Sequence, residues 1–103
     1  MASGRTIYIA GAGIAGMTLA LALAKFGATV VVMERNKRVQ EVGAGVQISP
    51  NARHVLNQLG LDKAISARSF EPAAIDVYPY RARRPLVSLE LGPVMREMFG
   101  APY

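Results

Sequence analysis

Apolar and polar positions in the first third of the chain follow the order strand, helix, strand. The β-branched and aromatic run Thr6–Ala10 predicts a short buried strand. Residues 17–26 are apolar on nearly every helical face and are followed by Gly27, which predicts a helix buried on several sides and ended by a glycine at C′. Residues 28–33 form a continuous apolar run, typical of an interior strand of a parallel sheet covered on both faces. Together these elements predict a βαβ unit with a right-handed crossover.

The next segment predicts a loop and the start of a second helix. Residues 36–45 combine charged residues and glycines and predict a loop, and residues 46–48 predict a short extended piece. Ser49 is a suitable N-cap, and Pro50 is favoured in the first helical turn. A helix is therefore expected from this point.

Apolar residues in that helix recur at helical spacing, and Gly60 stops the pattern. The predicted apolar face consists of Ala52, Val55, Leu56 and Leu59. His54 falls on the opposite, polar side and is expected to be structural. Residues 61–68 predict another short helix with Asp62 as its cap.

The pattern changes to a period of two after Phe70. Apolar and polar residues alternate over residues 75–80 and again over residues 87–91, which predicts two strands with one exposed face each. Residues 81–85 would form the turn between them, and Gly92-Pro93 would break the second strand. A helical turn or two is expected over residues 94–99.

Length and composition narrow the class of protein. A chain of 103 residues with 51% hydrophobic residues is globular and holds one small domain at most. The absence of cysteine excludes disulfides and cysteine-based zinc sites. The polar N-terminus does not resemble a signal peptide, and the longest apolar stretch ends at Lys25, short of the ~20 residues that span a membrane. The sequence therefore predicts a soluble, cytoplasmic protein with no membrane partner.

The net charge of +5 raises the question of an anionic partner such as nucleic acid. The basic residues are spread along the chain, and the densest cluster, Arg81, Arg83 and Arg84, falls in the predicted turn. A solvated turn is the favoured interpretation, so no nucleic-acid partner is expected. With His54 as the sole histidine, the sequence offers no metal site and no catalytic triad, and the catalytic residues are unknown.

The chemistry suggested by the sequence lies in the Gly-x-Gly-x-x-Gly loop between the first strand and the first helix. Gly11 permits a tight turn, Gly13 lets a pyrophosphate approach the backbone, and Gly16 lets the helix sit close to the strand. The N–H groups of the first helical turn and the helix dipole would bind phosphate. Glu34 ends the second strand, where its carboxylate can accept hydrogen bonds from ribose hydroxyls and would repel the 2′-phosphate of NADP. Arg35, which follows, can lie over an adenine ring. The ADP half of a dinucleotide is thus the predicted ligand.

A second glycine-containing segment, residues 41–51, precedes the helix that starts at Pro50. By itself it predicts either an ordinary loop or a loop whose backbone comes close to a ligand. An NAD-dependent dehydrogenase has no need of a ligand-binding segment here, so this segment is the feature that would distinguish an FAD-dependent enzyme from an NAD-dependent one.

These two segments, together with Leu56 to Leu61, resemble the N-terminus of class A FAD-dependent aromatic-acid monooxygenases of the salicylate hydroxylase-like and hydroxybenzoate hydroxylase type. The resemblance is specific over residues 5–61 and loose over residues 70–103. It implies a Rossmann-like α/β fold and an oxidoreductase that uses FAD, NAD(P)H and oxygen to hydroxylate an aromatic acid. The residues that it implies for the ADP half are Gly11, Gly13, Ala15, Gly16, Glu34 and Arg35. Those that it implies near the flavin are Gly45, Val46 and Gln47, with Gln47 facing the reaction chamber.

The same resemblance implies an incomplete domain. None of the family's later motifs, an Arg-Asp-Leu helix start, an Asp-Gly motif and a Gly-Asp motif, is present in the sequence. We therefore expect residues 1–69 to be the N-terminal part of an FAD-binding domain, and residues 70–103 to be the first strands of a substrate domain, a β-hairpin. Such a fragment would bind cofactor but would be inactive alone. It would expose apolar surface that favours self-association or association with a missing C-terminal part.

Two other classes of function stay open on the sequence alone. A βαβ unit with a glycine loop also occurs in other NAD- or FAD-dependent oxidoreductases, including dehydrogenases and amine oxidases. The missing motifs equally fit a catalytically inert truncated chain or a stand-alone basic binding module.

Overall fold

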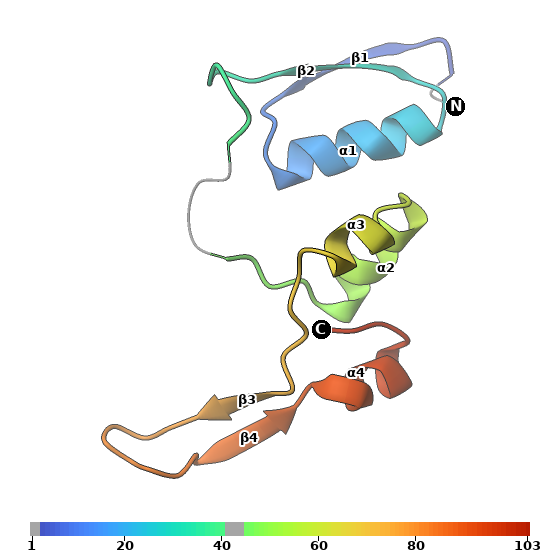
Figure 1. Cartoon of the computed structure of the whole chain (residues 1–103). Helices are drawn as coiled ribbons and strands as arrows, with labels where there is room; N and C mark the ends of the chain where they lie inside the picture. Colours follow the sequence, from blue (N-terminus) through green and yellow to red (C-terminus); the bar gives the residue numbers. More distant parts are fainter. Residues whose placement is uncertain (1–2, 41–44) are drawn as a thin grey trace. The chain divides into compact units, whose positions relative to one another are not determined.

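The computed structural model describes residues 3–40 and 45–103 and divides into two compact units, residues 1–45 and 46–103 (Figure 1). Part of the loop predicted over residues 36–45 lies outside the described residues, and so do Gly43 and Ala44 of the second glycine segment. Both units combine short strands with helices, as the mixed α/β prediction requires.

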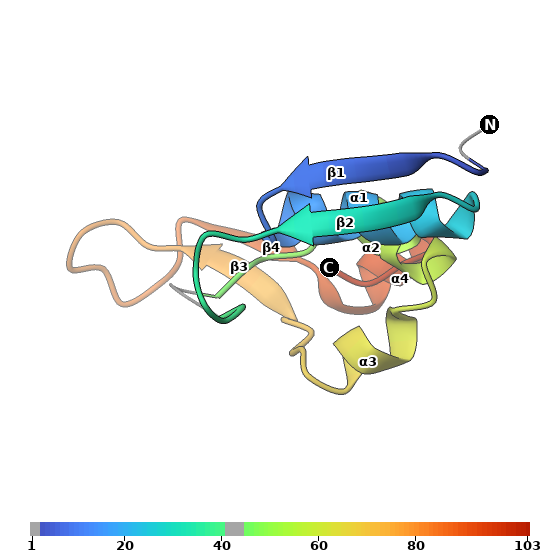
Figure 2. The ribbon, with the colours of Figure 1, turned by 90° about the horizontal axis from the view of Figure 1, so that it is seen from above.

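The first unit is the predicted βαβ unit. It contains β1 (Thr6–Ala10), α1 (Ile14–Lys25) and β2 (Thr29–Met33). The strands are parallel, with Thr6 opposite Thr29 and Ala10 opposite Met33, and α1 lies along one face of the pair (Figure 2). The predicted order and pairing are confirmed, although α1 begins at Ile14, earlier than the predicted Met17.

Two glycines delimit α1, and both have positive φ. Gly11 has φ +106° and turns the chain out of β1, and Gly27 has φ +83° and ends the helix at C′. Side chains with a Cβ rarely adopt these conformations. The predicted roles of these two glycines in the backbone are therefore confirmed.

The deep burial predicted for the βαβ unit is wrong. Among the described residues of this unit, Ile9 is the one buried apolar side chain, at 8% exposure. No described residue of α1 is buried. Leu19 is 50% exposed on α1, and Met33 is 51% exposed on β2. The physical reason is that β1 and β2 form a sheet of only two strands, and one helix covers only one face of such a sheet.

The second unit begins with two helices. They are α2 (Pro50–Gln58), with Ser49 as N-cap and Pro50 in its first turn as predicted, and α3 (Asp62–Ser66). Gly60 follows α2 with φ +77°. The extended piece predicted over residues 46–48 forms no strand.

The chain then forms a hairpin and a last helix. The elements are β3 (Ala74–Val77), β4 (Val87–Glu90) and α4 (Gly92–Phe99). β3 and β4 are antiparallel, which confirms the predicted hairpin, and α4 is longer than predicted because it begins at Gly92. The prediction of one covered face for each strand is wrong, since every residue of β4 is exposed and only Ile75 of β3 is half-buried.

Two predictions for the helices of this unit are wrong for a shared reason. Ala52 and Val55, placed on the apolar face of α2, are exposed, whereas Arg53 is 4% exposed. Asp62 does not cap α3: Leu61 occupies the N-cap position, and the Asp62 carboxylate binds Arg53 instead. The shared reason is that α3 packs against α2 through this ion pair, which turns Arg53 inward.

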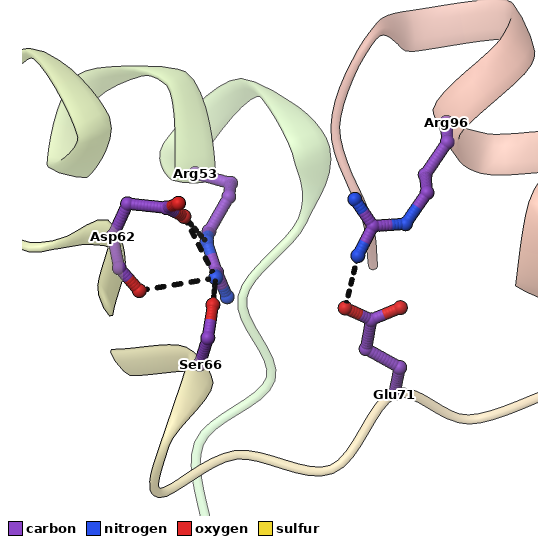
Figure 3. A network of polar contacts seen from close by, with 5 residues as sticks. All are labelled: Arg53, Asp62, Ser66, Glu71 and Arg96. Atoms are coloured by element: carbon purple, nitrogen blue, oxygen red, sulfur yellow. Dashed lines mark hydrogen bonds and ion pairs between the residues drawn. The ribbon is translucent and has the colours of Figure 1, made fainter. Parts of the chain in front are cut away.

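Arg53 is the centre of a polar network that joins α2 to α3 (Figure 3). Its Nη2 donates to Asp62 Oδ1 at 2.9 Å, its Nε donates to the same oxygen at 3.2 Å, and Nη2 also donates to the Ser66 hydroxyl. A buried guanidinium is stable only when such partners compensate for lost water. The same figure shows Arg96 of α4 paired with Glu71.

The segment after α4 is held against α2. His54 Nε2 lies 2.7 Å from the Phe99 carbonyl oxygen, and Gly100 turns the chain with φ +72°. Ala101, at 2% exposure, and Leu91, at 4%, are buried apolar residues of this unit, and Pro102 is buried beside Ala101 in the sequence. The contact between His54 and the Phe99 carbonyl oxygen supports the structural role expected for this histidine.

Candidate functional site

The glycine loop lies between β1 and α1 and is hydrogen-bonded to the end of β2. The Gly11 amide donates to the Met33 carbonyl oxygen at 2.7 Å, which fixes the loop at the end of β2. The Met17 amide donates to the Gly13 carbonyl at 2.9 Å, which begins the hydrogen-bond ladder of α1. The loop therefore leads directly from β1 into the helix.

Gly16 lets the helix approach the loop as the sequence predicts. A Cβ at this position would lie 2.0 Å from the Gly11 carbonyl oxygen and 3.4 Å from Cγ2 of Ile9. Real Cβ atoms essentially never approach another atom closer than 3.0 Å. Glycine is therefore required here by packing within the protein.

Gly13 differs from Gly16, because no described heavy atom lies within 4 Å of the Cβ that could be built on it. Its backbone is extended, with φ −76°, so conformation does not demand glycine either. Packing in the described part of the chain thus leaves open space at this position.

Among the described residues, no side chain caps the N-terminus of α1. Gly13 is the N-cap residue, so no side chain at this position can accept a hydrogen bond from the first turn, and that turn contains no acidic residue. The first N–H groups of a helix lack partners within the helix, and the helix dipole makes this end favourable for an anion. Ala15 is exposed at this end of α1.

Glu34 follows β2, and its half-buried carboxylate is aimed back at the glycine loop. The Ala12 amide donates to Glu34 Oε2 at 2.9 Å, and the Asn36 amide donates to Oε1 at 3.1 Å. These two hydrogen bonds, that from Ala12 first, hold the pKa of Glu34 below its ordinary value, with a smaller contribution from Arg35. Arg35 itself is exposed. The structure thus brings Glu34 to the loop, although it is 22 positions from Ala12 in the sequence.

The residues expected near a flavin have varied surroundings. A Cβ on Gly45 would meet no described atom within 4 Å, and Val46 is 65% exposed. Gln47 accepts a hydrogen bond through Oε1 from the Tyr103 hydroxyl at 3.3 Å. Val46, Gln47 and Tyr103 belong to the second unit, whereas Gly45 closes the first. The sequence carried no signal for the Tyr103 contact, because the two partners are 56 positions apart in the sequence.

The basic cluster lies in the exposed connection between β3 and β4. Arg81 has φ +59°, and its guanidinium lies 5.1 Å from the centroid of the Tyr80 ring. Such a cation–π contact contributes ~0.5–1 kcal/mol at an exposed site. In the described part of the chain the cluster is a solvated turn, as the sequence predicts.

No helix within residues 3–40 and 45–103 is long and apolar enough to cross a membrane.

Comparison with known proteins yields a family match and several relatives. The FAD binding domain family matches residues 5–96. The chain is 39% identical over 97 residues to 3-amino-4-hydroxybenzoate 2-monooxygenase of Streptomyces cremeus, a match that covers 94% of this chain and 25% of that protein. It is 36% identical to 3-hydroxybenzoate 6-hydroxylase 1 of Aquipseudomonas alcaligenes, with the same two coverages. It is 34% identical to 3-hydroxybenzoate 6-hydroxylase of Klebsiella oxytoca, over 100% of this chain and 26% of that protein. The chain therefore spans about a quarter of the length of the curated relatives that it matches.

Proposed function

The chain belongs to the FAD binding domain family, and from this premise we propose that its glycine loop holds the pyrophosphate of FAD. The open space at Gly13 carries the proposal, because neither packing nor backbone conformation requires glycine there. A pyrophosphate against the backbone would account for it. Next to that space lies the N-terminus of α1, whose N–H groups can donate to phosphate oxygens.

The other residues of the ADP half follow from their positions around this loop. Ala15 and Gly16 lie in the first turn of α1, and Gly11 turns the chain toward it. Glu34 would accept hydrogen bonds from the ribose hydroxyls, and Arg35 would lie over the adenine. A carboxylate at this place disfavours a 2′-phosphate, which supports FAD over NADP as the resident cofactor.

The flavin end of the cofactor would lie near Gly45, Val46 and Gln47. No described atom lies within 4 Å of a Cβ built on Gly45, and Val46 is exposed, and both observations support this assignment. Residues 1–69 would then form the N-terminal part of the FAD-binding domain, and residues 70–103 the first strands of a substrate domain.

We further propose that the whole protein hydroxylates an aromatic acid with NAD(P)H and oxygen. The support is the sequence identity to two relatives named as hydroxybenzoate hydroxylases and a third named as an aminohydroxybenzoate monooxygenase. Bound FAD supplies the redox chemistry of such a reaction. The part of this chain is to bind and orient the cofactor, and by itself the chain is expected to be inactive.

We expect the exposed apolar side chains to be covered by a second copy of the chain or by a C-terminal part of the protein. These include Tyr8, Ile14, Leu19 and Met33 in the first unit and Leu89 in the second. Exposed apolar surface of this extent favours a protein partner. No nucleic-acid partner is proposed, and a cytoplasmic location remains the prediction from sequence.

The test of cofactor binding uses the purified chain and added FAD. Flavin fluorescence should be quenched on binding, and heat denaturation should release free FAD with its characteristic absorbance. Gly13→Val should abolish the binding by placing a side chain where the pyrophosphate would lie. Ala24→Val adds the same kind of bulk at an exposed position near the other end of α1 and should bind normally. Equal binding by wild type and the Gly13 variant would refute the assignment of the loop.

A further inference from the structure

The Glu34 carboxylate is occupied on both oxygens by backbone donors of the protein. Oε2 accepts from Ala12, inside the glycine loop, and Oε1 accepts from Asn36, in the turn after β2. Ala12 stands between Gly11, which turns the chain, and Gly13, where the pyrophosphate would approach. The carboxylate therefore connects the loop to the end of the second strand through a side chain.

A backbone hydrogen bond makes the same connection in parallel. The Gly11 amide donates to the Met33 carbonyl oxygen at 2.7 Å, so two consecutive loop amides are held by two consecutive residues at the end of β2. A pair of adjacent hydrogen bonds restricts a loop more than either bond alone, because it removes rotation about the single contact. The loop conformation is thus fixed by contacts within the protein.

We infer that Glu34 is a positioning residue: its carboxylate clamps Ala12 and holds the glycine loop in its phosphate-binding form before any cofactor is present. The effect of this role on cofactor binding rests on the proposed function, because the clamped loop is the one that we assign to FAD. It is additional to the ribose contact, because the ribose would use lone pairs of the carboxylate that Ala12 and Asn36 leave available. Preorganisation of this kind lowers the entropic cost of binding.

The clamp also decides which amides can receive the pyrophosphate. The Ala12 N–H already donates to Glu34, so it is withdrawn from the set of phosphate donors. The donors that remain are those at the start of α1, from Gly13 to Gly16, whose amides precede the first ladder bond at Met17. Phosphate is thereby directed to the helix N-terminus and away from the turn.

The clamp depends on pH in a defined direction. The pKa of Glu34 is lower in the folded chain than its ordinary value because the charged carboxylate accepts two backbone hydrogen bonds, and Arg35 is the charged neighbour that adds to the effect. The stabilisation is therefore complete above the unfolded-state pKa and is lost as the pH falls through the lowered folded-state pKa. The loop should loosen only in acid.

The experiment follows the Ala12 amide by NMR in the cofactor-free chain. In wild type, the Ala12 amide proton should titrate together with the Glu34 carboxyl carbon, with a midpoint below that of an unperturbed glutamate. Glu34→Gln retains the shape but offers one acceptor oxygen for two amides, so the Ala12 titration should vanish and its hydrogen exchange should become faster. Glu97→Gln removes an exposed carboxylate from α4 and should leave the Ala12 titration unchanged. An Ala12 shift that is independent of pH in wild type, or unaltered in Glu34→Gln, would overturn the inference.

A second measurement keeps this inference separate from the proposed function. FAD titrations of wild type and Glu34→Gln above and below the Glu34 midpoint should show weaker binding in acid for wild type, and weaker binding with a smaller pH dependence for the variant. If the Ala12 titration is present but wild type binds no FAD, the clamp stands and the cofactor assignment fails. If FAD binds and the Ala12 amide shift does not follow the titration of Glu34, the cofactor assignment stands and the clamp fails.

Discussion

Substitution of Gly16 by alanine tests the close approach of α1 to the glycine loop. The new Cβ would lie 2.0 Å from the Gly11 carbonyl oxygen, and this separation must reach at least 3.0 Å. The neighbour is backbone, so the shift of about 1 Å has to be made by the loop or the helix as a whole. Gly11 cannot yield easily, because its amide is bonded to Met33 and its φ is +106°.

The expected magnitude follows from two opposing effects. Overpacking costs about 1–3 kcal/mol, and contact with rigid backbone places this case at the upper end. Alanine in place of glycine inside a helix returns about 0.5–1 kcal/mol. The net loss is therefore about 2 kcal/mol, and each kcal/mol lowers the melting temperature of a domain this small by about 4–8 °C. A decrease of roughly 8–16 °C is expected.

The assay is thermal unfolding of the cofactor-free chain, followed by circular dichroism at 222 nm. Gly13→Ala is the matched control: it adds the same methyl group in the same loop, where no described atom lies within 4 Å, and should cost about 0.5 kcal/mol as a weaker N-cap. Melting of the Gly16 variant within about 2 °C of wild type, or above it, would refute the packing between α1 and the loop.

The remaining predictions concern the second unit and the exposed surface. Asp62→Ala should lower the free energy of unfolding in urea by about 2 kcal/mol, because it leaves the buried Arg53 guanidinium without its carboxylate partner. Arg53→Met removes the buried charge itself and should lower it less. The reverse order would contradict the role of the ion pair. His54→Ala should cost about 1 kcal/mol and accelerate amide exchange at Ala101, since the bond to the Phe99 carbonyl is lost; unchanged exchange would show that the bond does not hold this segment. The purified chain should bind the dye ANS and associate as its concentration rises, because so much apolar surface is exposed. A monomer that melts cooperatively and does not bind ANS would count against this expectation.

The elements could be predicted from the sequence because their signals are local. A β-branched run, a helical repeat and a glycine at each end of the helix define β1, α1 and β2 within one residue for the strands and three for the helix start. Alternation with a period of two defines the hairpin in the same way. Each of these patterns acts over neighbouring residues, so no distant contact is needed to read it.

Burial was predicted poorly for a reason that the same patterns explain. The apolar runs of β2 and α1 are typical of a sheet with more strands and a second layer, and the sequence carries that signal whether or not those neighbours lie in the chain. Within the described residues a single helix covers a pair of strands, so Val31 is exposed at 38% and Leu19 at 50%. The pattern indicates the environment that suits a residue, and the tertiary structure decides whether that environment is supplied.

The sequence by itself determined the order of the elements, the position of the glycine loop between β1 and α1 and the family to which the chain belongs. The tertiary structure alone decided that Glu34 reaches the Ala12 amide, that Arg53 turns inward to Asp62 and that Tyr103 contacts Gln47. Each of these contacts joins residues that are far apart in the sequence or on different elements. Their formation depends on how the elements pack, and periodicity and turn residues carry no information about that geometry.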